Sequence, residues 1–118
     1  MVKSNFKNRV DFDTRKKESI RIFAKYPERI PIIVEKSATC NSIKEIDRNK
    51  FLVPADITMG QFMHIIRNRI KLDSSQAMYL FINNRMTTTS EMIAQTYHNY
   101  KDEDGFLYVT YAGESTFG

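Results

Sequence analysis

Residues 50 to 70 read KFLVPADITMGQFMHIIRNRI and decide the fold, because they join a short apolar strand to a capped amphipathic helix. Lys50 to Pro54 contains β-forming residues and predicts the strand. Thr58 and Gln61 have the spacing of a capping box, which marks the start of the helix. Five apolar residues then recur at the i, i+3, i+4 and i+7 spacing of a buried helical face: Met59, Phe62, Met63, Ile66 and Ile70.

A second helix is predicted upstream, from about Asp11 or Asp13 to Lys25. Both aspartates are favoured N-cap residues, and neither Gly nor Pro interrupts the chain before Pro27. The short basic segment KSNFKNR at 3 to 9 predicts a single helical turn. The apolar stripe of the longer helix would consist of Ile22, Phe23 and Tyr26.

A strand is predicted between these helices and Lys50. Arg29 to Lys36, RIPIIVEK, is apolar and β-branched. Pro31 has no N–H to donate, so it should lie where a ladder hydrogen bond is dispensable. The polar SATCNSIKEIDRN that follows predicts an extended surface loop rather than a tight hairpin.

Three more elements are predicted after residue 70. Ala77 to Ile82 reads as a buried strand that ends at the turn pair Asn83-Asn84. Thr88 and Glu91 predict a capped helix that runs to about Tyr100. A last strand is expected from 106 to 111, with Leu107, Val109 and Tyr111 on one face and Phe106, Tyr108 and Thr110 on the other. This order predicts an α+β fold with a mixed sheet over a helix, for which the β-grasp of ubiquitin is one solution.

The composition predicts one compact domain. Of 118 residues, 42% are hydrophobic and 27% charged, with four Gly and three Pro, which excludes a disordered or collagen-like chain. No apolar run approaches the roughly 18 residues of a membrane-spanning helix, and the first residues lack an apolar secretion segment. We therefore expect a cytosolic chain whose membrane attachment, if any, is added later.

The net charge of +4 is unevenly distributed along the chain. Residues 1 to 36 carry ten basic and five acidic groups, residues 37 to 72 six and three, and residues 73 to 118 two and six. A basic first half could steer acidic partners to one surface, or the unlike charges could simply solvate opposite faces.

Few residues are suited to catalysis or metal binding. The single cysteine, Cys40, excludes internal disulfides and CxxC metal patterns, and His64 and His98 are too far apart to imply a shared metal. A hydrolase that uses Cys40 stays formally open, although nothing in the sequence predicts a lowered thiol pKa. With neither a P-loop nor a Rossmann glycine pattern, we expect no enzyme, cofactor or metal.

The final residues, AGESTFG, form a small polar tail that ends in Gly118. Glycine has no Cβ, so a terminal glycine can enter a narrow active-site channel and present its carboxylate for activation and transfer to an amine. Glycine is common in all proteins, so this feature is weak when taken alone.

Four longer blocks carry a more specific signal than the terminal glycine. They are KYPERIPIIVEK at 25 to 36, EIDRNKFLVPADITMGQF at 45 to 62, IRNRIKL at 66 to 72 and DGFLYVTYAGESTFG at 104 to 118. With them the chain resembles the autophagy-related ubiquitin-like modifiers, the GABARAP and light-chain family. The resemblance implies a helical extension at 1 to 27, a β-grasp core at 28 to 112 and a flexible tail at 113 to 118. It also implies conjugation of Gly118 to phosphatidylethanolamine.

The same resemblance implies an edge strand that binds an extended aromatic-x-x-aliphatic peptide. The pocket for the aromatic side chain would consist of Glu18, Ile22, Pro31, Ile33, Lys50, Leu52 and Phe106. The pocket for the aliphatic side chain would consist of Phe51, Val53, Pro54, Ile57, Phe62, Ile65 and Arg69. Acidic residues beside the aromatic would meet Arg29, Arg48 and Lys50. A second binding face would carry Tyr79 and Phe81. Without the resemblance, Ile22, Ile33, Leu52, Phe62 and Ile65 would be read as ordinary core.

The partners implied are E1-like and E2-like conjugation enzymes, a deconjugating cysteine protease, motif-bearing receptors and phosphatidylethanolamine membranes. The chain would reside in the cytoplasm and, once lipidated, on autophagosomes, with the vacuole or lysosome and the cytoskeleton as further sites. Two features depart from the family pattern: the first loop between strands is one residue longer, and TTTSEM at 87 to 92 replaces a proline-containing segment. An unconjugated, basic adaptor for tubulin, nucleic acid or membrane surfaces is the alternative, although we expect no nucleic-acid partner.

Overall fold

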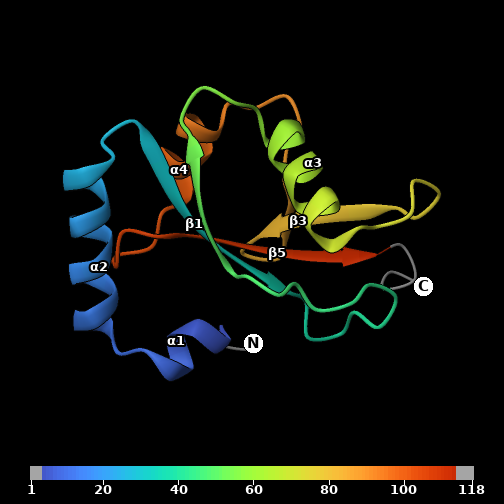
Figure 1. Cartoon of the computed structure of the whole chain (residues 1–118), viewed down its shortest axis with the longest axis horizontal. Helices are drawn as coiled ribbons and strands as arrows, with labels where there is room; N and C mark the ends of the chain where they lie inside the picture. Colours follow the sequence, from blue (N-terminus) through green and yellow to red (C-terminus); the bar gives the residue numbers. More distant parts are fainter. Residues whose placement is uncertain (1–3, 114–118) are drawn as a thin grey trace.

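The computed structural model describes residues 4–113 and contains a five-stranded sheet with helices on both of its faces (Figure 1). In chain order the elements are α1 (Asn5–Arg9), α2 (Phe12–Lys25), β1 (Arg29–Lys36), β2 (Lys50–Pro54), α3 (Met59–Ile70), β3 (Met78–Ile82), β4 (Arg85–Met86), α4 (Ile93–Tyr100) and β5 (Leu107–Gly113). Both N-terminal helices and the mixed α+β order are therefore as predicted.

The strands lie in the order β2-β1-β5-β3-β4. β1 and β5 are parallel at the centre, and the other neighbouring pairs are antiparallel. Pro31 lies where its missing N–H costs little. The Val34 amide bonds to Asn49, on the β2 side, so the Pro31 nitrogen faces β5, and the pairing with β5 begins only at Ile32.

The main core lies between one face of the sheet and α3. The helix begins at Thr58 with the predicted capping box and buries the face that carries Phe62 and Ile66. Against it pack the alternate residues of β1, β3 and β5, among them Ile32, Leu80 and Val109. Deep burial of these apolar side chains is the principal stabilising contribution to the fold.

The opposite face of β1 and β5 is covered by α1 and α2. Phe6 of α1 packs on Ile33 and Phe106 in a second, smaller apolar cluster. The rings of Phe6 and Phe106 meet edge to face, with their centroids 5.7 Å apart. The buried residues of α2 are Arg15 and Ser19, so this helix is held to the sheet largely by polar contacts. Ile22 and Phe23 of the predicted stripe are half-buried.

One prediction about the later elements is wrong, and one short element was not predicted. Helix α4 begins at Ile93 with Met92 as its N-cap, and no side chain caps it. Thr88 and Glu91 instead belong to a turn, and the Glu91 carbonyl accepts a hydrogen bond from the Met59 amide of α3. Tertiary contacts of this segment with α3 thus override the local capping pattern. The sequence analysis also missed the two-residue strand β4.

The ends of two other elements also refine the predictions. Asn83 and Asn84 form the predicted turn, both with positive φ, and this turn joins β3 to β4. Strand β5 continues to Gly113, beyond the expected end at Tyr111, so the tail begins no earlier than residue 114. The predicted faces of β5 are confirmed, because Leu107, Val109 and Tyr111 join the main core whereas Phe106 and Tyr108 join the smaller cluster.

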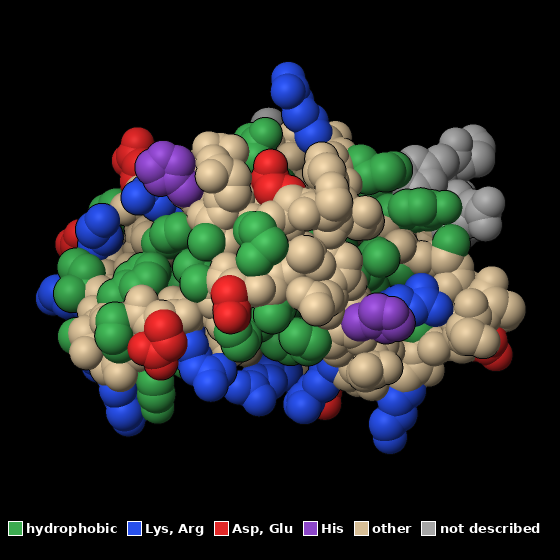
Figure 2. Space-filling model, turned by 90° about the horizontal axis from the view of Figure 1, so that it is seen from above, with side chains coloured by type: hydrophobic (Ala, Val, Ile, Leu, Met, Phe, Trp, Pro, Cys, Tyr) green, Lys and Arg blue, Asp and Glu red, His purple; other side chains and the backbone are tan. Residues whose placement is uncertain are grey.

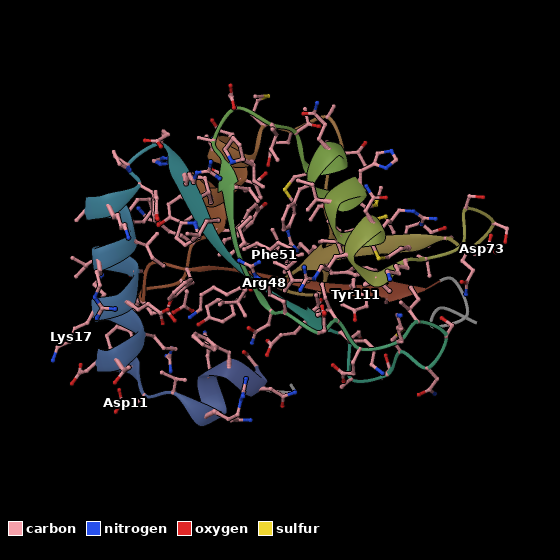
Figure 3. The ribbon with its side chains drawn as sticks, viewed as in Figure 1. Asp11, Lys17, Arg48, Phe51, Asp73 and Tyr111 are labelled. Atoms are coloured by element: carbon pink, nitrogen blue, oxygen red, sulfur yellow. The ribbon has the colours of Figure 1, made fainter. Side chains whose placement is uncertain are left out.

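The long loop from 37 to 49 contributes to the core although its sequence is polar. Cys40 and Ile43 are buried within it. The Tyr111 hydroxyl donates a 2.7 Å hydrogen bond to the Lys44 carbonyl, which fastens the loop to β5. Figure 3 shows Phe51 and Tyr111 in the interior, whereas Lys17 lies on the outer side of α2. Across residues 4–113, no helix is both long enough and apolar enough to span a bilayer.

Candidate functional site

Strand β2 is an edge of the sheet, because it is the first strand in the sheet order and its neighbour there is β1. Its side chains alternate between two faces. Lys50 and Leu52 lie opposite Ile33 and Pro31 on the face of the N-terminal helices. Phe51 and Val53 lie on the face of α3. One strand thus contributes to both predicted pockets.

The backbone of β2 offers hydrogen-bonding groups on its outer side. The carbonyl of Asn49 and the amide of Ala55 bond to β1 and to the residue that precedes it. In an antiparallel ladder the bonding direction alternates, so Phe51 and Val53 also face β1, whereas Lys50 and Leu52 direct their amides and carbonyls outward. This edge can accept an additional strand.

The residues predicted for the aromatic pocket come together between β2 and α2. Ile33 and Phe106 are fully buried and form a floor, on which Ile22 packs half-buried. Glu18 of α2 forms an ion pair with Lys50 of β2, which joins the helix to the edge strand. Pro31 is buried opposite the half-buried Leu52.

Phe6 joins the residues predicted for the aromatic pocket, although it was not among them. It is buried against the floor residues, and the Lys50 ammonium lies 5.5 Å from the centroid of its ring. Phe6 also places α1 on the sheet, because its backbone N–H donates a 3.0 Å hydrogen bond to the Glu35 carboxylate on β1. The apolar character of Phe6 within a basic segment is the one sequence signal that could have identified it.

The residues predicted for the aliphatic pocket form a buried floor and an exposed rim on the opposite face. Phe51, Val53 and Phe62 are buried in the main core, with the rings of Phe51 and Phe62 edge to face at 5.9 Å. Ile57 is half-buried against them. The exposed rim consists of Pro54, Ile65, which is 39% exposed, and Arg69.

Arg69 is held in place by a carboxylate outside the predicted set. Its Nε and Nη2 atoms donate hydrogen bonds of 2.9 and 3.3 Å to the two carboxylate oxygens of Asp47. This bidentate bond lowers the pKa of Asp47. The contact connects the end of α3 to the chain just before β2, and it fixes the orientation of the arginine at the pocket rim.

The basic residues predicted beside the pockets bond to the edge strand itself. Arg29 Nη1 donates a 3.2 Å hydrogen bond to the Leu52 carbonyl, and Arg48 Nε donates one of 3.2 Å to the Lys50 carbonyl. Figure 2 shows Lys and Arg side chains in a row along one margin of the molecule, on the side where β2 is the front strand in Figure 1. The edge is therefore electropositive.

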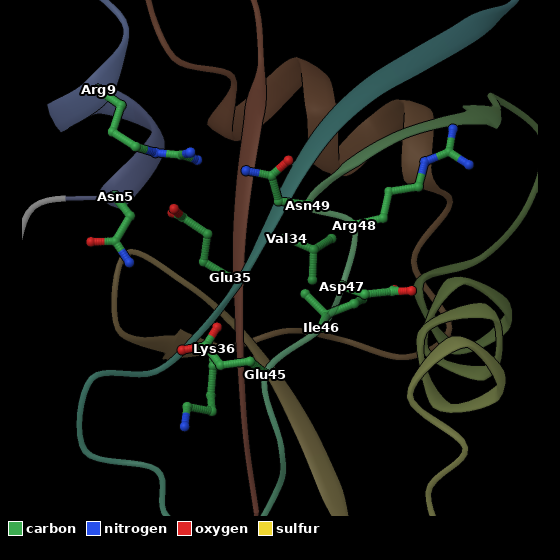
Figure 4. A pocket seen from close by; sticks show the side chains of 10 residues that line it. All are labelled: Asn5, Arg9, Val34, Glu35, Lys36, Glu45, Ile46, Asp47, Arg48 and Asn49. Atoms are coloured by element: carbon green, nitrogen blue, oxygen red, sulfur yellow. The ribbon is translucent and has the colours of Figure 1, made fainter.

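A polar hollow of about 460 Å³ lies at the start of this edge, between α1, the end of β1 and residues 45–49 (Figure 4). Its charged lining is balanced, with three basic and three acidic side chains: Arg9, Lys36, Arg48, Glu35, Glu45 and Asp47. In the close-up Arg9 points into the hollow from α1, whereas Arg48 points away from it along β2. A balanced lining gives this hollow little preference for an anion or a cation.

A buried ionic cluster fixes the N-terminal helices over the aromatic pocket. Arg15 Nε lies 2.8 Å from a carboxylate oxygen of Asp104, and both side chains are almost fully buried. The Tyr108 hydroxyl donates a 2.5 Å hydrogen bond to the same oxygen, and Ser19 donates one to the Asp104 carbonyl. Burial, together with the bond to this carboxylate, raises the pKa of Tyr108 well above its usual value.

Sequence reasoning could not find this cluster, because its ion pair joins Arg15 and Asp104, which are separated by almost ninety positions. A second ion pair, Lys7 Nζ to Asp102 Oδ1 at 2.5 Å, connects α1 to the same turn. We refer to the Arg15–Asp104 and Lys7–Asp102 pairs as the N-terminal clamp.

The remaining candidates lie away from the β2 edge. Tyr79 and Phe81, the residues predicted for a second binding face, are half-buried and alternate with the buried residues of β3. Cys40 is 1% exposed, which leaves its thiol inaccessible to a substrate and gives the hydrolase hypothesis no support. Among residues 4–113, no three His, Cys, Asp or Glu side chains are placed to hold a metal ion. Gly118 lies outside the described residues.

Comparisons with known proteins identify the family. The family model described as autophagy protein Atg8, ubiquitin-like, matches residues 14–118. The chain is 51% identical to autophagy-related protein 8e of Arabidopsis thaliana over 115 residues, 98% of this chain and 93% of the relative. It is 50% identical to autophagy-related protein 8 of Candida glabrata, with 99% and 98% covered.

A solved structure agrees with these sequence matches. The crystal structure of Trypanosoma brucei Atg8 superposes with a TM-score of 0.93 at 41% identity, and the match covers 99% of this chain and all of that one. This likeness confirms the predicted ubiquitin-like α+β fold. The chain therefore belongs to the Atg8 family of ubiquitin-like autophagy proteins.

Proposed function

We propose that this chain is a non-enzymatic modifier that recruits receptors through the β2 edge while it is anchored to membranes through Gly118. The observation that carries the recruitment half is the alternation of β2, whose outer backbone groups stand between two separate apolar sites. A docked strand would place one anchor on the Leu52 face and one on the Phe51 face. This geometry fits receptors with an aromatic-x-x-aliphatic motif.

Family membership supports the anchoring half. An E1-like enzyme would use ATP to adenylate the Gly118 carboxylate, with release of pyrophosphate, and a cysteine thiol would displace AMP to form a thioester. The thioester would pass to the cysteine of an E2-like enzyme, and the amine of phosphatidylethanolamine would displace that thiol to form an amide. Two acyl chains give stable membrane attachment, whereas a single chain is marginal. A cysteine protease would hydrolyse the amide and return the protein from the autophagosome to the cytoplasm, with the vacuole or lysosome as a further destination.

Peptide titration tests the recruitment half. The double variant Phe51→Ala, Leu52→Ala should weaken binding of a Trp-x-x-Leu peptide by at least about thirtyfold, because each pocket loses a central apolar contact. Tyr79→Ala on β3 is the control and should bind the peptide like the unchanged protein. Equal affinity of the double variant and the unchanged protein would refute recruitment through β2.

Membrane flotation tests the anchoring half. The chain expressed in cells should give a form that floats with membranes and migrates faster on a gel than the unconjugated protein. Phospholipase treatment should remove this form, and Gly118→Ala should lack it. The same soluble behaviour in both proteins would refute conjugation through Gly118.

A specific surface supports the alternative of a tubulin- or membrane-surface adaptor. Ile20 on α2 is 57% exposed between exposed Lys17 and Arg21, so a basic helix face carries an apolar side chain in solvent. Under this alternative, binding to microtubules or anionic vesicles would fall after Lys17→Ala and Arg21→Ala. It would not depend on Gly118.

A further inference from the structure

The polar hollow between α1, the end of β1 and residues 45–49 contains charged side chains of both signs that a ligand can reach. Of its six charged lining residues, Asp47 bonds to Arg69 of α3, and Arg48 points away along β2. The remaining four carry two charges of each sign: Arg9, Lys36, Glu35 and Glu45. Four ion pairs occur among residues 4–113, and none of them includes any of these four residues.

The close-up shows how these side chains are arranged. Arg9 and Glu35 point toward one another from α1 and β1, whereas Lys36 and Glu45 line the lower part of the hollow (Figure 4). Glu35 is held in place, because its Oε2 atom accepts a 3.0 Å hydrogen bond from the backbone N–H of Phe6. Its second carboxylate oxygen can accept a hydrogen bond from a ligand.

The end of β1 adds a backbone donor to the hollow. The Val34 amide bonds to Asn49 on the β2 side of the strand. Backbone groups alternate in direction along a strand, so the Lys36 amide faces the same side. The pairing of β1 with β2 ends at Ile33, and Lys36 lines the hollow. Its N–H is therefore directed toward the hollow rather than toward a neighbouring strand.

This lining suits a ligand that carries both charges. A simple anion or cation would be attracted by half of the side chains and repelled by the other half. A zwitterion can place its anionic group at Arg9 and its cationic group at the two glutamates, so both halves attract it. The volume of about 460 Å³ is within the range of small-molecule sites.

The lining also indicates which kind of cationic group fits. Quaternary ammonium groups, which have no N–H, are bound by the faces of aromatic rings. None of the ten described residues that line the hollow is aromatic. A primary ammonium has three N–H donors, and the carboxylates of Glu35 and Glu45 can accept them.

We propose that this hollow is a binding site for a small zwitterion with a primary ammonium group and a phosphate, the chemistry of phosphoethanolamine. The phosphate would accept hydrogen bonds from the Arg9 guanidinium and the Lys36 amide, and its three outer oxygens can use both donors together. Such a zwitterion occurs as a free compound and as a phospholipid headgroup. The site uses neither the two β2 pockets nor Gly118, so it goes beyond the proposed function.

An NMR titration of the full, unconjugated chain with phosphoethanolamine tests the site. Saturable shifts should be confined to the backbone amides of α1, the end of β1 and residues 45–49. At equal ionic strength, phosphocholine, ethanolamine and inorganic phosphate should each bind at least about fivefold more weakly, because each lacks one set of charge-assisted hydrogen bonds.

Two substitutions remove one charge each from the hollow. Arg9→Met and Glu35→Gln should each weaken phosphoethanolamine at least about fivefold. Glu35→Gln retains a side-chain oxygen that can accept the Phe6 N–H, so α1 should stay in place. Arg21→Met on α2 and Glu103→Gln are the matched controls, because they remove the same charges from exposed positions outside the hollow. Both should bind like the unchanged protein.

Vesicle cosedimentation then identifies the source of the zwitterion. Vesicles of phosphatidylethanolamine and phosphatidylcholine are compared with vesicles of phosphatidylcholine alone, since both are electrically neutral. Stronger binding to the former, lost in Arg9→Met and Glu35→Gln, supports the site and assigns it to a headgroup. Equal binding to both kinds of vesicle, with phosphoethanolamine still bound in solution, supports the site and assigns it to the free compound.

Three results would overturn the proposal: no saturable shift with phosphoethanolamine, equal affinity for inorganic phosphate or phosphocholine, or unchanged affinity in both hollow variants. These measurements use neither the Gly118 conjugate nor a receptor peptide. The zwitterion site and the proposed function can therefore fail independently.

Discussion

The two faces of the sheet are covered by different means. On the α3 face, Phe62 and Ile66 belong to a large apolar core. On the face of α1 and α2, three buried apolar residues are surrounded by the N-terminal clamp, in which Arg15 and Asp104 form a buried ion pair. Volume-conserving apolar substitutions cost little in a core, whereas a buried charge is strongly destabilising once its partner is lost.

The two pockets predicted on β2 therefore have different structural supports. The floor of the aliphatic pocket is part of the main core, so that pocket should persist as long as the protein is folded. The residues predicted for the aromatic pocket instead contact the N-terminal helices, through Phe6 in the smaller cluster and through the Glu18–Lys50 ion pair. The aromatic pocket should therefore depend on the clamp, and the two pockets should fail under different substitutions.

Phe62→Ala should destabilise the protein most, because it removes a buried side chain from the apolar core on the α3 face. Truncation of a fully buried phenylalanine removes its contacts and leaves a cavity, at a cost of about 3–5 kcal/mol in the free energy of unfolding. Chemical denaturation should show this loss, and amide hydrogen exchange should accelerate throughout the sheet. A loss confined to α3 would mean that the two faces do not share one cooperative core.

Asp104→Ala should have a smaller and more local effect, because it removes the buried ion pair of the N-terminal clamp. The substitution leaves the Arg15 guanidinium buried without its carboxylate, which costs about 3 kcal/mol. Local opening of α1 and α2 can relieve this cost, so their amides should exchange faster while those of α3 change little. Glu103→Ala, at an exposed neighbour of the same charge, should have neither effect. Uniform acceleration across the chain would show that the clamp belongs to the global fold.

Alkaline titration of Tyr111 on β5 should have the smallest effect on stability. Burial raises the pKa of Tyr111 to about 12, whereas a tyrosine in the unfolded chain titrates near pH 10. The Tyr111 hydroxyl thus keeps its proton to a higher pH in the folded state than in the unfolded state. The stability that this difference contributes is fully present below about pH 10 and is lost as the pH rises toward 12. The free energy of unfolding should fall over that interval, and less steeply in Tyr111→Phe. Parallel pH profiles for both proteins would refute the assignment.

The sequence predicted those elements whose signals are local. The Thr58 capping box and the helical period of α3 lie within one segment, and the two faces of β5 follow from strict alternation. The start of α4 was wrong because its preceding segment bonds to α3, a contact that the local pattern of Thr88 and Glu91 does not contain. The clamp was missed for the same reason, since Arg15 and Asp104 meet only after folding.

The sequence predicted which residues gather at the candidate site, but it did not predict all of the contacts among them. The residues of both predicted pockets do gather around β2, and the resemblance to a family, rather than periodicity, supplied most of them. No pattern indicated that Arg29 bonds to the Leu52 carbonyl, and an apolar residue in a basic segment was the one signal for the packing of Phe6 on Ile33 and Phe106. Both depend on the tertiary position of a side chain.

If strand β2 binds the two anchors of a peptide on opposite faces, a double-mutant cycle should show it. The protein variant is Leu52→Ala, and the Trp-x-x-Leu peptide is changed to Ala at either anchor. We predict that Leu52→Ala loses its effect once the Trp is removed and keeps its full effect once the Leu is removed. Equal coupling of Leu52 to both anchors would contradict the account, because it would place both on one face of β2.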